Sequence, residues 1–430
     1  MARTPSVPSH GRLVVLLGAL AAFGPLSMDM YLPGLPSMAR DLSAPAWAVQ
    51  LTITTSMLGL AGGQLVAGPI SDALGRRRPL LVGLAAYMAT SLLCAVAPSI
   101  WALLAFRLFQ GVAGAAGIVI ARAIVRDLHS GVAAARFFAL LMLVVALAPI
   151  LAPLFGGQLL HITDWRGIFV VLAAIGALLL LATWAMLGET LPMPRRHGGG
   201  LTATVHVFGG LVGDRAFMGY TLSAGLLFGA MATYISGSPF VLQDVHGVSP
   251  QLFSVIFAAN AGGIMLASQT SRALVGRYGP RAILTLGVSI GAAGGLGVLV
   301  SVVADLGLAG LLPSLFVVVS SVGMVLPNAA ALALADRPRT AGSASGLLGL
   351  TQFAIGALAA PLAGVAGSGT ALPMAVVIAT LSAAAVACLF VLVGRRESGG
   401  GVRAGAQGGR GAGDPRQAPL EAGGEVDPGL

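Results

Sequence analysis

Long runs of apolar residues, separated by short segments rich in Gly, Pro and Arg, cover most of this chain. A helix needs about 20 consecutive apolar residues to cross the hydrocarbon core of a bilayer. Six such runs precede a polar stretch at 188–215 and six follow it, at 13–32, 47–68, 80–97, 100–121, 137–160, 168–187, 217–241, 252–274, 283–303, 306–334, 342–366 and 372–393. The pattern predicts an all-α membrane protein of twelve transmembrane helices in two six-helix pseudo-repeats.

The same pattern divides the chain into four regions. We expect an N-terminal six-helix bundle at 1–187, a cytoplasmic central linker at 188–215, a C-terminal six-helix bundle at 216–396 and a tail at 397–430. The tail is rich in Gly with scattered charges and has too few apolar residues to form a core, so we expect it to be disordered and cytoplasmic.

Composition excludes several classes of function. With 57% hydrophobic and 9% charged residues, the 430-residue chain leaves little sequence for a globular catalytic domain. Every basic residue is Arg, so a complete Walker A loop and a lysine Schiff base are both excluded. The six His and two Cys residues lack the spacing of metal ligands. We therefore expect no enzyme, no cofactor and no metal, but transport driven by an ion gradient.

The Arg residues also predict the topology. Of the 24, 21 fall before the first run, after the last or in alternate connections, Arg40 and Arg166 fall on the other side, and Arg107 lies within a run. The positive-inside rule then places both termini in the cytoplasm. We expect the protein to lie in the inner (cytoplasmic) membrane. The net charge of +9 reflects this topology, so we expect no nucleic-acid partner.

The two halves share short sequence patterns at an offset of about 204 residues. Gly75 precedes the third run as Gly279 precedes the ninth, and the segment at Pro153 resembles that at Pro361. Two parallel six-helix repeats are typical of transporters that rock around a site between their halves.

Asp29 is the only acidic residue inside a predicted span. A carboxylate there costs about 2.5–3.5 kcal/mol on insertion scales, and burial favours its protonated form. Pro25 and Pro33 interrupt the helical hydrogen bonds on both sides of it. We predict a proton or substrate site; the alternative is an interfacial acid, since Asp29 lies about 24 Å beyond Leu13 along a helix.

Arg107 lies about 10 Å into the fourth run. One interpretation is a fixed cation facing the bundle interior, where it would favour the ionised form of Asp29. The alternative is an Arg that snorkels to the interface. Gly111 and Gly114, farther along the same run, allow close helix contact.

The connection at 68–78 combines an acid, a tight turn and a cluster of cations. Asp72 beside this cluster suggests an ion pair that stabilises one conformation of the transporter and breaks in another. The alternative is a solvated positive-inside loop. The predicted conformational latch consists of Gly68, Asp72, Gly75, Arg76 and Arg77.

These motifs resemble the major facilitator superfamily, and most closely its twelve-helix drug:proton antiporters of the bicyclomycin and chloramphenicol resistance (Bcr/CflA) type. The resemblance extends to about residue 396. The 68–78 connection is similar to the family's loop between helices 2 and 3, and Arg107 with Gln110, Gly111 and Gly114 is similar to its helix 4 motif. The segments at 29–33, 165–169 and 234–241 resemble this branch in particular.

The resemblance implies a role for Arg107 in proton transfer and a helix 5 antiporter motif that seals the export path. The motif residues here are Pro149, Pro153, Gly156 and Gly157. Ala152 stands where the antiporter motif prefers Gly, which weakens the prediction of export.

Together these observations predict a monomeric, proton-coupled exporter of small amphipathic drugs or toxins, such as phenicol- or bicyclomycin-like antibiotics, with one proton per cycle. The alternative is a proton-coupled importer or exporter of a native metabolite. Candidate cavity residues are polar and lie in helices expected to face the centre, although they are equally suited to hydrogen bonds between helices: Tyr31, Gln50, Thr54, Asn260, Asn328 and Gln352.

Overall fold

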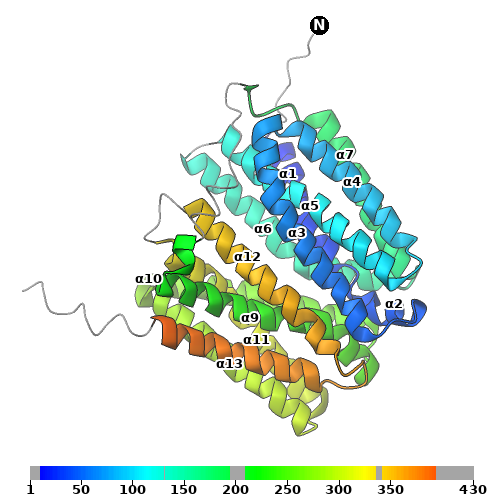
Figure 1. Ribbon diagram of the computed structural model, residues 1–430, viewed down its shortest axis with the longest axis vertical. Helices are drawn as coiled ribbons and strands as arrows, with labels where there is room; N and C mark the ends of the chain where they lie inside the picture. The colour runs from blue at the N-terminus through cyan, green and yellow to red at the C-terminus, as the bar shows by residue number, and fades with distance from the viewer. Residues whose placement is uncertain (1–9, 130, 194–208, 336–340, 394–430) are drawn as a thin grey trace, which may run out of the picture.

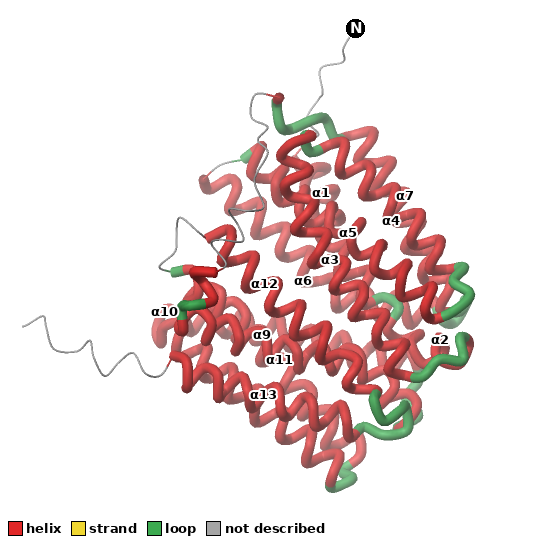
Figure 2. Tube along the Cα trace, in the orientation of Figure 1, coloured by secondary structure: helices red, strands yellow, loops and turns green. Residues whose placement is uncertain are grey.

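The computed structural model describes residues 10–129, 131–193, 209–335 and 341–393, and all regular structure within these ranges is helical (Figures 1 and 2). The predicted tail at 397–430 and most of the predicted linker lie outside the described residues. Described helices that are long and apolar enough to cross a membrane number ten, with α10 counted once.

The first half contains six long helices and two short ones. They are α1 (His10–Asp29), η1 (Leu32–Gly34), α2 (Leu35–Asp41), α3 (Ala46–Leu74), α4 (Arg77–Ala95), α5 (Ile100–Leu128), α6 (Gly131–Leu159) and α7 (Trp165–Met186). α3 is not among the ten apolar helices. It carries the buried polar side chains of Gln50, Thr52, Thr54 and Ser56, which suit a helix that packs against other helices instead of lipid.

The second half repeats this order. Its helices are α9 (Arg215–Phe240), η3 (Val241–Val245, a π-helix), α10 (Pro250–Val303), α11 (Gly307–Leu334), α12 (Ala341–Ala359), η4 (Ala360–Gly364) and α13 (Leu372–Val393). α10 changes direction at Gly279, whose φ is 77°. Gly75 has a φ of 90° at the matching turn between α3 and α4. This backbone region favours glycine, so the shared turn supports the repeat.

Each predicted span falls on a helical segment of the described residues, but the helices extend beyond the predicted spans, most clearly at the connection after the fourth span. α5 continues to Leu128 and α6 begins at Gly131, so Arg122 and Arg136, expected in a loop, are helical. Arg is a good helix former. The apolar run therefore marks the part of a helix that meets lipid, whereas the helix itself extends beyond it.

The two halves lie side by side and make contact at one end, which we call the Arg40 end after a residue of α2 (Figure 1). There the Thr54 hydroxyl donates to the carbonyl of Ala357 over 2.9 Å, and Gln251 donates to the carbonyl of Gly157 over 3.1 Å. The opposite end, which contains the turn between α3 and α4, is called the Arg76 end.

Glycines bring α3 and α5 within backbone contact. A Cβ on Gly59 would overlap the carbonyl oxygen of Leu108, and a Cβ on Gly111 would lie 2.5 Å from that of Ser56. Close approach of this kind allows dispersion contacts between helices that lipid does not supply.

We expect Gly59→Ala to lower the stability of the protein by about 1–3 kcal/mol, because the added methyl group must displace α5. Gly62, on the same helix, has no atom within 4 Å of its ideal Cβ position. Gly62→Ala should therefore leave stability unchanged or raise it. Thermal unfolding of the purified protein in detergent checks both; equal melting temperatures for the two variants would contradict the packing.

Candidate functional site

A cavity of about 610 Å³ separates the two halves. Its wall comes from α1, α3, α5 and α6 in the first half and from α9 and α12 in the second. Most lining side chains are apolar, and the polar ones are Asp29, Gln64, Arg122, Arg126 and Ser345. The exposed Arg126 and Ser345 show that the cavity opens toward the Arg76 end. An apolar cavity with few polar groups is the usual form of a small-molecule site.

Asp29 occupies the cavity wall at a break in the first membrane helix. It is the last residue of α1, and η1 begins three residues later with Pro33 in its first turn. The interruption that the prolines predict is therefore present, on the side of Pro33, while α1 continues through Pro25. Irregular backbone at membrane depth occurs where it lines a cavity or is buried in protein. Asp29 is the only acid among the residues that line the cavity.

Arg107 lies inside the first half, where it is 1% exposed. One terminal nitrogen donates to the Gln110 side chain over 2.5 Å and to the carbonyl of Ser27 over 3.4 Å. The guanidinium carbon lies 4.3 Å from the centroid of the Tyr31 ring and 5.5 Å from that of Phe169. These contacts agree with an inward-facing cation and not with an Arg that snorkels to the interface.

Arg107 and Asp29 do not form a hydrogen bond or an ion pair within the described part of the chain. Asp29 faces the cavity, whereas Arg107 faces a small space between α1, α3, α4 and α5. Two nitrogens of Arg107, Nε and one terminal nitrogen, have no hydrogen-bond partner. The link between the two residues is the end of α1 itself, because Arg107 contacts the carbonyl of Ser27, two residues before Asp29.

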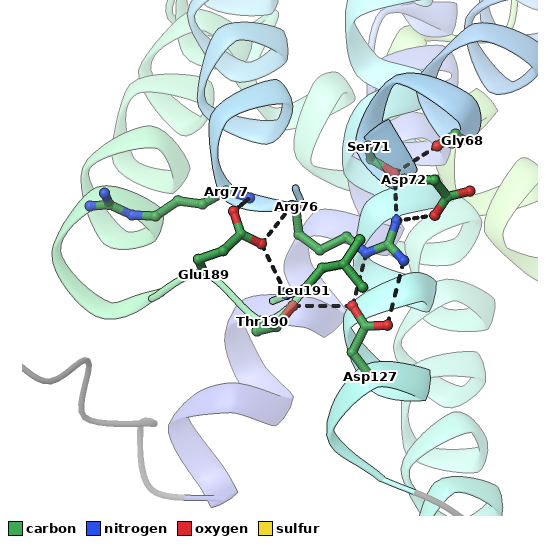
Figure 3. A network of polar contacts seen from close by, with 9 residues as sticks. All are labelled: Gly68, Ser71, Asp72, Arg76, Arg77, Asp127, Glu189, Thr190 and Leu191. Carbon is green, nitrogen blue, oxygen red and sulfur yellow. Dashed lines mark hydrogen bonds and ion pairs between the residues drawn. The ribbon is translucent and has the colours of Figure 1, made fainter. Parts of the chain in front are cut away.

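The predicted latch residues take part in a partly buried network at the Arg76 end (Figure 3). The Arg76 guanidinium bonds to Asp72 over 2.5 Å, to Ser71 over 2.8 Å and to Asp127 over 2.8 Å. Burial alone would lower the pKa of Arg76, but the hydrogen bonds and charges of Asp127 and Asp72 outweigh it and raise the pKa above the usual value. Arg76 therefore stays charged and ties the end of α5 to the turn between α3 and α4.

Arg77 and the backbone of Arg76 bind the segment that follows α7. The two backbone amides donate to Glu189 over 2.8 and 3.3 Å, and the Arg77 side chain donates to the carbonyls of Trp184 and Leu187, each over 2.8 Å. Figure 3 shows the side chains of Arg76 and Arg77 pointing in opposite directions from the turn. All of these partners belong to the first half, so the network unites that half and does not bridge the two.

Asp127 and Glu189 were not identified from the sequence. Asp127 lies beyond the predicted end of the fourth span, and Glu189 lies in the polar stretch assigned to the linker. In the sequence, each is only an acidic residue in a polar segment, and acidic residues are common in any exposed segment. Folding brings both acids to Arg76, and this proximity depends on helix ends that the sequence did not locate.

The antiporter-motif residues lie on α6, where Pro149 and Pro153 are both within the helix. A Cβ on Gly156 would overlap the carbonyl oxygen of Met30 in the first half, and a Cβ on Gly157 would overlap Ser254 in the second. α6 is therefore packed without a gap between α1 and α10 at the Arg40 end. Ala152, the departure from the motif, is fully buried.

The six candidate cavity residues do not line the cavity in this conformation. Tyr31 bonds to Thr52 over 3.0 Å, Asn260 donates to the Tyr234 hydroxyl over 2.7 Å, and Asn328 donates to Ser271 over 2.7 Å.

The other three candidates lie between the halves or on the second half. Thr54 bonds across the interface as described, and Gln50 packs against Gly364, where a Cβ would lie 2.5 Å from its side-chain oxygen. Gln352 is partly exposed on α12. In this conformation the candidates that form hydrogen bonds link one helical segment to another. Such bonds between helices were the alternative to substrate contact in the sequence analysis.

The sequence profile described as Major Facilitator Superfamily matches residues 17–361. The chain belongs to this family. It is 42% identical over 381 residues to "Uncharacterized MFS-type transporter YdgK" of Bacillus subtilis (strain 168), which covers 87% of this chain and 93% of that protein. It is 30% identical over 361 residues to "Bicyclomycin resistance protein homolog" of Haemophilus influenzae, covering 84% of this chain and 91% of that protein.

A solved structure titled as the nucleoside transporter NupG, in a variant with one substitution, has the same fold, with a TM-score of 0.74 and 14% sequence identity. The match covers 89% of this chain and 100% of that one. The predicted all-α fold of two helical repeats is thus confirmed, and the protein is a multi-pass membrane protein of a transporter family whose members take small molecules as substrates.

We expect Asp127→Ala to destabilise the protein by about 1.5–3 kcal/mol, because the buried Arg76 loses its charged hydrogen-bond partner on α5 and keeps Asp72. The control is Arg78→Gln, since Arg78 is exposed in the first turn of α4, and its effect should stay within about 0.5 kcal/mol. Thermal unfolding in detergent measures both changes. The network has no structural importance if the two variants unfold at the same temperature.

Proposed function

We propose that this protein is a proton-coupled exporter of small amphipathic compounds that works by alternating access in the inner membrane. The observation that carries the proposal is a single carboxyl group, Asp29, at a helix break on the wall of an otherwise mostly apolar cavity between two helical halves. The relative named for bicyclomycin resistance supports bicyclomycin-like antibiotics as cargo, and the sequence motifs that resemble the Bcr/CflA branch add phenicols.

The proposed cycle uses the charge of Asp29 to couple two movements. With both termini in the cytoplasm, the Arg76 end faces inward and the structure is inward-open. Cargo enters the cavity and Asp29 releases its proton to the cytoplasm. After the halves rock, a proton from outside neutralises Asp29 and cargo leaves. Exchange results because one cavity holds cargo and proton in turn. When Asp29 is ionised and the cavity is empty, the energetic penalty of the exposed carboxylate prevents the halves from rocking, so protons do not cross without cargo.

Arg107 contributes by holding the end of α1 in place. Its contacts with the Ser27 carbonyl and the Tyr31 ring lie on either side of Asp29 in the chain. We infer that Arg107 sets the position and electrostatic environment of Asp29 through this segment. It acts as a positioning residue, and its fixed charge lowers the cost of the ionised carboxylate at longer range.

The Arg76 network would keep the first half rigid as the halves rock. Asp72 is the exception, since half of its side-chain surface is exposed although it pairs with Arg76. We infer that Asp72 is free to meet the second half when the Arg76 end closes, which would make it the switching member of the predicted latch. Asp127 would then keep Arg76 paired in both conformations.

A single proton supplies enough free energy for this task. One charge that crosses 100 mV yields about 2.3 kcal/mol, and one pH unit adds about 1.4 kcal/mol. Because 1.4 kcal/mol corresponds to a factor of about ten, one proton per neutral molecule sustains a gradient of roughly several hundredfold. We propose a stoichiometry of one, since one carboxyl group lies in the cavity.

We expect Asp29→Asn to abolish proton-driven accumulation of bicyclomycin or chloramphenicol in inverted vesicles while exchange of labelled for unlabelled compound continues. The amide removes the proton site but keeps the shape of the cavity. Asp305→Asn is the control, because Asp305 is exposed and its φ of 50° suits Asn. Undiminished, pH-dependent accumulation by Asp29→Asn would overturn the proposal.

The sign of the lumenal pH change in proteoliposomes separates export from import. With the protein oriented inside-in and cargo in the lumen, an antiporter acidifies the lumen as cargo leaves, whereas a symporter of the same cargo makes it more alkaline. A response to a native metabolite but to none of the antibiotics would establish the alternative cargo.

The Arg40–Asp244 ion pair, 3.3 Å long, joins the two halves at the end that we propose faces outward. Since Arg40 is largely exposed, we expect Arg40→Asp to favour outward opening by only about 1 kcal/mol, or roughly fivefold. The rate at which an impermeant thiol reagent, added from outside, labels Met57→Cys in the cavity measures this opening, with both native cysteines replaced by Ser. Adding Asp244→Arg should restore slow labelling; no restoration would show that the pair does not close the gate.

A further inference from the structure

Arg122 is a cation without a partner in the cavity wall. It lies on α5 six residues before the helix ends, and it forms no hydrogen bond or ion pair with any described residue. Its Nε is buried and unsatisfied. Leaving this N–H group unsatisfied carries an energetic cost, although the side chain as a whole is only partly buried. Arg126, one turn farther along, adds a second positive charge to the same wall.

Among the described residues, no acid is available to neutralise Arg122. Asp29 is the only acid in this part of the chain that lines the cavity, and Asp127 is already bound to Arg76. The backbone of Gly24 lies against the side chain of Ile118, which gives a common level for α1 and α5. Asp29 and Arg122 lie five and four residues from that level in opposite directions, so roughly 14 Å separates them along the helices.

The described residues of α12 that line the cavity carry no charge. They include Ser345, Gly346 and Gly349 in the first turns of the helix, which leave space and one hydroxyl donor for an anionic group. Between this region and Asp29 the wall is apolar, formed by residues such as Met57, Leu60, Ile235 and Phe353. The cavity thus has a cationic mouth, an apolar middle and one carboxyl group at its inner part.

We propose that the cargo of this transporter is an amphipathic compound with an anionic group, and that Arg122 binds this group. The proposal rests on proton-coupled export through Asp29, and it favours acidic amphipathic compounds as cargo over the neutral antibiotics considered above. The guanidinium offers the parallel donors that a carboxylate, sulfonate or phosphate accepts, and Arg126 attracts the anion to the open mouth. The apolar body of the cargo then lies toward Asp29. Protonation of Asp29 and binding of the cargo alternate in this cavity, as the proposed cycle requires.

Anionic cargo also changes the driving force. A monovalent anion that leaves the cell as one proton enters moves two elementary charges down the membrane potential, whereas a neutral compound moves one. The charges in the cavity therefore fit a transporter that moves two elementary charges down the membrane potential in each cycle.

The test is equilibrium binding to the purified full-length protein in nanodiscs of phosphatidylcholine, without any gradient. The probes are radiolabelled chloramphenicol hemisuccinate, which is anionic, and its neutral methyl ester. We expect the acid to bind at least tenfold more tightly than the ester. Arg122→Gln should abolish this preference without weakening ester binding, Arg122→Lys should retain part of it, and the control Arg78→Gln, at an exposed position of α4, should retain all of it.

Three results would overturn the proposal. The first is no preference for the acid, or no binding of it, by the unmutated protein. The second is an equal loss of acid and ester binding in Arg122→Gln, which would indicate a structural role. The third concerns nanodiscs that contain phosphatidylglycerol. If this lipid displaces the acid from the unmutated protein but not from Arg122→Gln, and ester binding does not change, the site belongs to a lipid headgroup.

The proposed function fails separately. If Asp29→Asn still accumulates cargo in response to pH, proton coupling through Asp29 is wrong whatever the charge preference. If proton-driven export holds but the acid has no advantage over its ester, only the inference about Arg122 is lost.

Discussion

The cost of an uncompensated charge in an apolar environment governs this structure. The described residues give each buried charge a distinct solution: Arg76 is neutralised by Asp72 and Asp127, Arg107 is held by Gln110 and the Tyr31 ring, and Asp29 faces a cavity. Asp29 is thus the buried charged residue for which the structure shows a cavity instead of a charged or polar partner. Because insertion of such a group costs several kcal/mol, we base our proposal of proton coupling on this residue.

The same constraint explains how the two halves meet. At the Arg40 end they are joined by neutral hydrogen bonds, by glycines of α6 that allow backbone contact, and by one exposed ion pair. None of these contacts is individually strong, since exposed ion pairs contribute about 1 kcal/mol or less. An interface of weak contacts opens at a modest energetic cost, whereas the Arg76 network inside the first half does not. Rigid halves and a yielding interface are what alternating access requires.

The sequence predicted the helices well because lipid-facing length and apolar composition are local properties. The sequence pattern shared by Gly75 and Gly279 coincides with a shared turn, since a positive φ restricts the residue type wherever it occurs. The prediction from the sequence failed at the end of α5, where the helix continues past the apolar run to Leu128 at the Arg76 end. That failure hid Arg122 and Asp127, two residues on which our account of the cavity and of the Arg76 network depends.

Asp29 and the cations near it show where sequence reasoning ends. Rarity alone identified Asp29 and Arg107, because an ionisable residue within an apolar run is costly regardless of its neighbours. The sequence by itself therefore determined the membrane-embedded helices, their repeat and the charges that need compensation. Only the tertiary structure decided which charge meets which partner, since Arg107 lies beside Tyr31 instead of Asp29 and Arg76 binds an acid 51 residues away. Such pairings arise from helix packing between distant segments, which no local pattern encodes.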